Sequence, residues 1–159
     1  MNTKRIGLIS ILVVGLMLAG MLAYQILAVR NAMAASKSLV GSWNVEVTVV
    51  QQNSVFPSLM TFYNDGNLIT DETPSPLETS GHGDWVRTGP NKAAYTFVFL
   101  IGSTEPGQWL KGTVSGEVNF DPRKDTWNGP FTIKIVDQDG NEVLSDTGTM
   151  DGTRISAAP

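Results

Sequence analysis

The chain has 159 residues, and its 11 Lys and Arg against 15 Asp and Glu give a formal net charge of −4. It has no cysteine, which excludes disulfides, thiolate metal ligands and thiol catalysis. Three positive charges precede residue 36, so residues 36–159 hold eight positive and 15 negative charges, and this net charge of −7 argues against nucleic acid as a partner.

Residues 1–35 have the composition of a signal peptide or an N-terminal membrane anchor. Lys4 and Arg5 precede an apolar run over 6–29, which exceeds the roughly 20 residues needed to span a bilayer. Small residues around Ala34 also allow signal-peptidase cleavage, so both alternatives stay open. Either one predicts that residues 36–159 are exported, to the periplasm or the cell exterior, or anchored to the membrane by the uncleaved segment.

The segment from Gly41 to Val50 predicts the first strand of this second domain. Its residues alternate with period two, which is typical of a strand with one buried and one solvated face. The expected buried face carries Trp43, Val45, Val47 and Val49.

Seven more strands are predicted where alternating segments lie between turn residues: 59–63, 68–70, 83–88, 93–101, 109–120, 126–136 and 143–155. Residues 51–57 and 71–80 are expected to be loops, and the acidic 71–78 stretch could be a lid or a solvated turn. Short connections make neighbouring strands antiparallel, and either a closed barrel or a two-layer sandwich would satisfy them. The fold class we expect is all-β, an eight-stranded antiparallel up-and-down barrel over residues 36–159. It is favoured by inward-phase glycines that allow strands to coil, Gly112, Gly116, Gly129, Gly148 and Gly152.

The opening Gly41-Ser42-Trp43 resembles the Gly-x-Trp motif of lipocalins and fatty-acid-binding proteins, the calycin group. The resemblance implies that Trp43 plugs one barrel end and that Arg154 lies across its indole. The segment Gly83-Asp84-Trp85 is similar to a second arrangement found in lipocalin-like domains. The chain departs from these families because it shows no helix after the barrel and no helical lid after the first strand. Small bacterial barrels of the allene-oxide-cyclase and spirotetronate-cyclase types are similar in size and layout.

An eight-stranded barrel is either packed solid or wide enough to hold one small ligand. The inward glycines leave space, and we expect large side chains to line it as an apolar pocket: Phe62, Trp85, Tyr95, Phe97, Phe99, Trp127, Phe131 and Met150. The leading hypothesis is an exported lipocalin-like barrel that binds a small apolar molecule, with Tyr95 or Tyr63 as polar contact. The alternatives are a cyclase or isomerase acting on an apolar polyene-like substrate, and a structural or interaction module with a solid core.

Few residues suggest reaction chemistry, so no catalytic residue is assigned and no cofactor or metal is expected. His82 is the only histidine, and Asp84 two residues later would point the same way, but Trp85 is expected inward, which leaves both at the surface. The segment over 137–142 resembles part of a calcium loop and also reads as a hairpin turn. The strand over 93–101 is apolar on both faces, and its outer face could pair two copies as a homodimer.

Overall fold

The computed structural model describes residues 38–72, 77–103 and 107–157. The predicted signal or anchor, residues 1–35, lies outside the described residues. Among those that are described, no helix has the length and hydropathy needed to cross a membrane.

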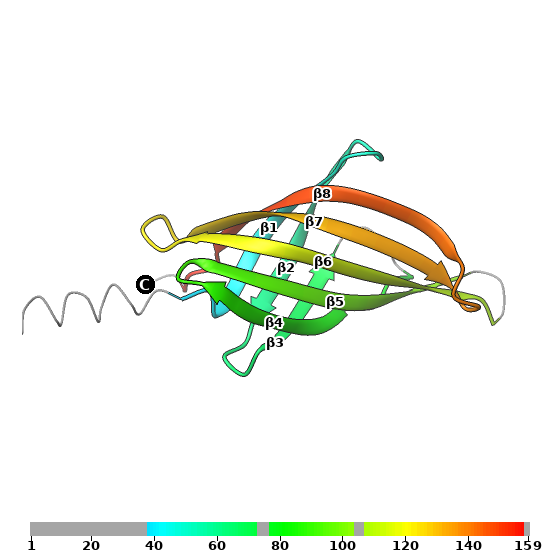
Figure 1. Ribbon diagram of the computed structural model, residues 1–159, viewed down its shortest axis with the longest axis horizontal. Helices are drawn as coiled ribbons and strands as arrows, with labels where there is room; N and C mark the ends of the chain where they lie inside the picture. Colours follow the sequence, from blue (N-terminus) through cyan, green and yellow to red (C-terminus); the bar gives the residue numbers. More distant parts are fainter. Residues whose placement is uncertain (1–37, 73–76, 104–106, 158–159) are drawn as a thin grey trace, which may run out of the picture. The chain divides into compact units, whose positions relative to one another are not determined.

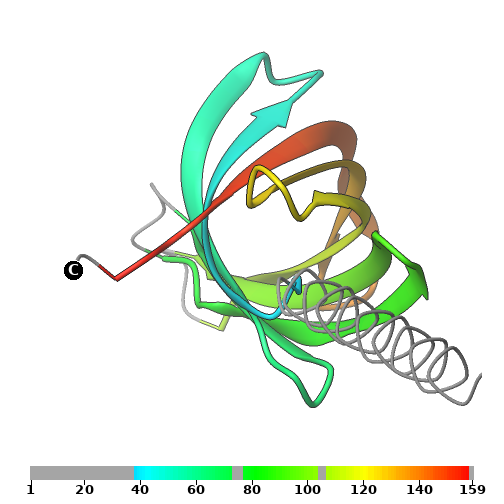
Figure 2. The same ribbon diagram turned by 90° about the vertical axis from the view of Figure 1, so that its left-hand side faces the viewer.

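Eight strands make up the described part of the chain, and each pairs antiparallel with the next. The last strand also pairs with the first, which closes the sheet into a barrel (Figures 1 and 2). The prediction of an all-β, eight-stranded antiparallel barrel is confirmed for the described residues. The strands are β1 (Gly41–Val49), β2 (Ser54–Phe62), β3 (Asn67–Glu72), β4 (Gly81–Gly89), β5 (Lys92–Gly102), β6 (Trp109–Asp121), β7 (Thr126–Asp137) and β8 (Glu142–Arg154).

β1 has the alternation that the sequence predicts. Trp43, Val45, Val47 and Val49 are buried, whereas Asn44 and Glu46 are exposed. Because successive side chains of a strand point to opposite faces, this pattern sets which face of β1 looks into the barrel. β1 pairs with β2 on one side and with β8 on the other, so its register links the two ends of the chain.

The prediction of a loop over residues 51–57 is wrong for its second half. β2 begins at Ser54, and residues 54–57 pair with residues 46–49 of β1. Proline lacks the N–H that an interior strand donates, which is why Pro57 suggested a loop. The pairing of β2 with β3 starts only at Ser58, so Pro57 lies on a stretch where β1 is the one neighbouring strand among the described residues. A missing donor is tolerated there.

Four of the five inward glycines lie directly opposite an aromatic residue of a neighbouring strand. The pairs are Gly112 with Phe99, Gly116 with Tyr95, Gly148 with Phe131, and Gly152 with Trp127. A methyl group added at these glycines would lie only 2.1–2.5 Å from the nearest atom of the partner's side chain. Each ring therefore occupies the space that a side chain on the opposite strand would need. The fifth, Gly129, is held against the backbone carbonyl of Glu117.

Trp43 lies near the barrel end where β1 begins and β8 ends, opposite Arg154 in the register. Its side chain is fully buried, and its indole N–H donates to the Leu39 carbonyl at 2.9 Å. The Arg154 guanidinium lies over the ring at 4.1 Å from the centroid, so the contact implied by the calycin resemblance is present. Arg154 also donates to Asp125 Oδ1 at 2.7 Å, to the Val40 carbonyl at 2.9 Å and to the carbonyl of Ser38.

Replacing Gly152 by alanine should destabilise the fold, because the added methyl would meet the Trp127 ring at 2.1 Å. Overpacking of this kind costs about 1–3 kcal/mol. Urea denaturation measures the change. The control is Gly89→Ala, where the new methyl would be 3.5 Å from Lys92 Cβ, an ordinary contact. Equal effects of the two substitutions would contradict the packing described for Gly152.

Arg154→Lys should destabilise the protein by about 1–3 kcal/mol, since lysine keeps the charge but loses the planar stack on Trp43 and the fork of donors. Thermal unfolding at matched ionic strength measures this loss. Arg87→Lys, at an exposed position of β4, is the control and should be close to neutral. A neutral Arg154→Lys would mean that charge alone accounts for the contribution of Arg154.

Candidate functional site

The eight side chains predicted to line a pocket are all brought into the barrel interior. Each is at most 7 % exposed: Phe62, Trp85, Tyr95, Phe97, Phe99, Trp127, Phe131 and Met150. They pack against one another. Phe62 makes edge-to-face contacts with Trp85 and Trp127 at centroid distances of 5.7 and 5.9 Å, and Tyr95 stacks on Phe97 at 6.1 Å. These residues form a core, and none of them lines the groove described next.

Three of these eight side chains carry a polar group, and the Trp85 indole N–H donates to the Tyr63 carbonyl at 2.8 Å. The Tyr95 hydroxyl donates to the Met150 sulfur at 3.1 Å, and burial followed by the nearby Glu72 charge raises the Tyr95 pKa above its usual range. The Trp127 indole N–H is buried and has no hydrogen-bond partner. A buried donor without a partner is costly. These eight side chains therefore form a mostly apolar cluster with one buried donor, the Trp127 N–H, that has no partner among the described residues.

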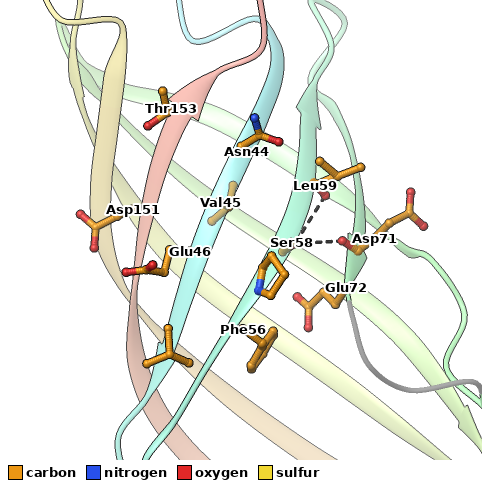
Figure 3. Close-up of a pocket in the computed structure, with 12 residues that line it drawn as sticks. Asn44, Val45, Glu46, Phe56, Ser58, Leu59, Asp71, Glu72, Asp151 and Thr153 are labelled. Carbon is orange, nitrogen blue, oxygen red and sulfur yellow. Dashed lines mark hydrogen bonds between the residues drawn. The ribbon is translucent and has the colours of Figure 1, made fainter.

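A groove of about 620 Å³ lies along β2 and the strands beside it (Figure 3). We call it the β2 groove. Its apolar residues come from β1 and β2, and its carboxylates from β1, β3 and β8. Figure 3 shows Glu46 and Asp151 on neighbouring strands and Asp71 and Glu72 beyond β2. The lining residues are Asn44, Val45, Glu46, Val55, Phe56, Pro57, Ser58, Leu59, Asp71, Glu72, Asp151 and Thr153.

The groove draws on both faces of the sheet. Four of its residues alternate inward and are buried or half-buried, Val45, Phe56, Ser58 and Glu72, whereas the other eight are exposed. β3 pairs with β2 only as far as the pair Ser58–Glu72, so β2 extends beyond β3 toward the β1–β2 turn. Val55 lies on that extension, whereas Leu59 lies opposite Asp71 of β3. Both apolar side chains face outward and are 61 % and 50 % exposed.

Glu72 is the ionisable group of the groove with the most perturbed environment. Burial, with a smaller contribution from the charge of Glu78, raises the pKa of Glu72 to about 7. Burial also raises the pKa of Glu78. Ser58 next to Glu72 hydrogen-bonds Thr70 Oγ1 at 3.1 Å and the Asp71 carbonyl at 3.1 Å. Glu72 can therefore exist in either protonation state near neutral pH, which is the condition for proton transfer or for pH-dependent binding.

Sequence reasoning missed Glu72 because it ended the third strand at Thr70 and assigned residues 71–80 to a loop. In the structure β3 continues to Glu72. The sequence does contain a signal for an inward Glu72, because Leu68, Thr70 and Glu72 share one phase of a period-two pattern. In the structure Leu68 and Thr70 are buried. The acidic residues after Thr70 predict a solvated loop, and this prediction is wrong for residues 71 and 72.

The other candidates lie at the surface. His82 and Asp84 are exposed on β4, whereas Trp85 is buried, in the arrangement expected from their phases. In the turn over 137–142, the Asp137 carboxylate accepts hydrogen bonds from the N–H of Asp139 at 3.0 Å and of Asn141 at 2.8 Å. That carboxylate thus shapes the hairpin turn.

Glu72→Gln should remove a pH dependence of stability. The folded pKa of Glu72, about 7, exceeds its ordinary value of 4.5, so the folded state holds the proton more tightly and stability falls as pH rises between these values. The loss is up to about 3 kcal/mol. Glutamine resembles the protonated acid, so the variant should match the wild type near pH 4.5 and exceed it near pH 8.

Urea denaturation at the two pH values measures this difference. Glu117→Gln, at an exposed position on β6, controls for the loss of one negative charge. A difference between wild type and Glu72→Gln that is the same at both pH values would contradict the burial of the Glu72 carboxyl.

Comparison of the chain with protein-family models and with curated proteins found no match. The barrel architecture is therefore the structural feature that supports the lipocalin-like resemblance. Because one fold serves many functions, function has to be argued from the β2 groove.

Proposed function

We propose that this protein is an exported, lipocalin-like barrel that binds a small, largely apolar molecule, and that the β2 groove is the binding site. The groove volume of about 620 Å³ carries the proposal. Small-molecule sites typically measure about 300–1,000 Å³ and combine an apolar wall with a few polar groups. The proposed site is separate from the eight interior side chains expected to line a pocket, because none of those eight lines the β2 groove.

The composition of the groove supports this function. Val55 and Leu59 offer apolar side chains on the outer face of β2, and half-buried Phe56 alternates inward with Ser58. Ser58 and Glu72 add polar atoms to the lining. Burying an apolar molecule against exposed side chains is favourable at about 25 cal/mol per Å² of area removed from water. A structural module would have no need of a groove that combines apolar side chains with polar groups.

A second candidate function, the cyclase or isomerase, is favoured by one specific observation. The pKa of Glu72 is raised to about 7, so at neutral pH this carboxyl is both protonated and ionised in comparable amounts. A general acid or base works best when its pKa lies near the working pH. In that case Glu72 would donate or remove the proton, and the apolar residues beside it would orient the substrate.

Native mass spectrometry of the protein purified from its own host tests the proposal. A retained small molecule is the expected result, and its structure separates a carried ligand from a substrate or product. Titration with an environment-sensitive apolar dye then places the site. Leu59→Gln should weaken dye binding by about fivefold, because part of the apolar wall is lost.

Leu100→Gln is the matched control, since Leu100 is also an outward-facing strand leucine, 45 % exposed against 50 % for Leu59, but lies on β5 outside the groove. It should leave dye binding unchanged. A protein that carries no small molecule and binds no dye would contradict the proposed function and leave the structural module as the explanation.

A further inference from the structure

We propose that the β2 groove selects an amphiphilic cation: a small molecule that joins an apolar body to a positively charged amine. This inference rests on the proposed function and adds the chemical class of the ligand. Two separate features of the groove carry it, an exposed apolar wall and a rim of carboxylates.

The charge of the groove has one sign. Its lining holds four carboxylates, Glu46, Asp71, Glu72 and Asp151, and no lysine, arginine or histidine. A concave surface lined by one sign of charge concentrates ions of the opposite sign. The groove therefore favours a cation and disfavours an anion such as a fatty acid.

Two of these carboxylates are placed against each other by the strand register. Glu46 of β1 pairs directly with Asp151 of β8, and both side chains are exposed on the outer face. Like charges at directly opposed strand positions destabilise a sheet by a fraction of a kcal/mol to about 1 kcal/mol. Removing either charge would relieve that repulsion, and so would a bound cation between the two carboxylates.

Basic side chains neutralise carboxylates elsewhere on the barrel. Lys134 pairs with Glu142 at 2.9 Å, and Arg154 pairs with Asp125 at 2.7 Å. Among the residues that the structure describes, no basic side chain pairs with Glu46, Glu72 or Asp151. Asp71 differs, because it accepts a hydrogen bond from Ser80 Oγ. The groove thus contains three carboxylates without a basic partner among the described residues, and a cationic ligand can neutralise their charge.

The apolar wall of the groove favours an amphiphilic cation over a hydrated metal ion or a polyamine. Val55 and Leu59 project from the outer face of β2, with Pro57 between them and next to Glu46 in the register. An ion without an apolar part would leave these side chains in water. A ligand with both parts would bury them and place its amine at the Glu46–Asp151 pair.

The experiment measures affinities of three probes with the same apolar body, using isothermal titration on the protein as its host exports it. They are 2-(1-naphthyl)ethylamine, a cation at neutral pH, its neutral alcohol counterpart 1-naphthaleneethanol, and the anion 1-naphthaleneacetate. The amine should bind at least about tenfold more tightly than the alcohol, and the acetate more weakly than either. Because exposed charges are screened, the preference for the amine should shrink as salt is raised.

The double variant Glu46→Gln and Asp151→Asn should bring the affinity of the amine close to that of the alcohol and leave the alcohol unchanged. The control is Asp84→Asn with Glu117→Gln, which removes one Asp and one Glu from exposed strand positions outside the groove. It changes the net charge equally and should keep the amine preference. Equal losses in the two double variants would overturn the inference, since the preference would then follow net charge alone.

The inference and the proposed function fail in different ways. If the alcohol binds and Leu59→Gln weakens it, but the amine binds no more tightly, the inference is overturned and the proposed function stands. If no probe binds, both are overturned. Self-association that Leu59→Gln abolishes, or binding of an oligolysine peptide with no naphthyl probe bound, would assign the groove to a second copy or to a protein partner and would also overturn the inference.

Discussion

The pairing of glycine with an aromatic residue across neighbouring strands is the constraint on which the barrel interior depends. At four positions the ring of one strand covers a glycine of the next, as Trp127 does over Gly152. Eight strands enclose little volume. At these four positions the ring fits because the residue facing it has no side chain. The four rings consequently occupy interior space that side chains on the facing strands would need.

The β2 groove lies apart from the cluster of aromatic side chains in the interior. β2 is longer than the part of it that β3 covers, and its extension carries exposed apolar side chains next to inward-facing Ser58 and half-buried Glu72. The same registers that close the barrel bring Glu46 beside Asp151 and Ser58 beside Glu72. The apolar wall and the carboxylates of the β2 groove are therefore consequences of register and strand length, and no single motif encodes them.

Much of the fold was predictable from local pattern. Period-two alternation identified the buried face of β1 and the inward set of aromatic residues, and turn residues separated the strands. The predictions were wrong where the residue composition favoured a loop but the alternation of a strand continued. Pro57 favoured a loop where β2 has already begun. The acidic residues after Thr70 favoured a loop where β3 continues to the inward-facing Glu72. Both errors lie in the β2 groove, so the candidate site was predicted less well than the barrel around it.

The sequence by itself determined the strands, their antiparallel order and which residues face inward, because these depend on contacts between near neighbours along the chain. Through the resemblance to the calycin group, it also predicted that Arg154 lies across the indole of Trp43. Only the tertiary structure decided which ring lies opposite which glycine, because that depends on strand register. It likewise decided the environment of Glu72 and the pairing of Glu46 with Asp151, since strand registers bring together residues that are far apart along the chain.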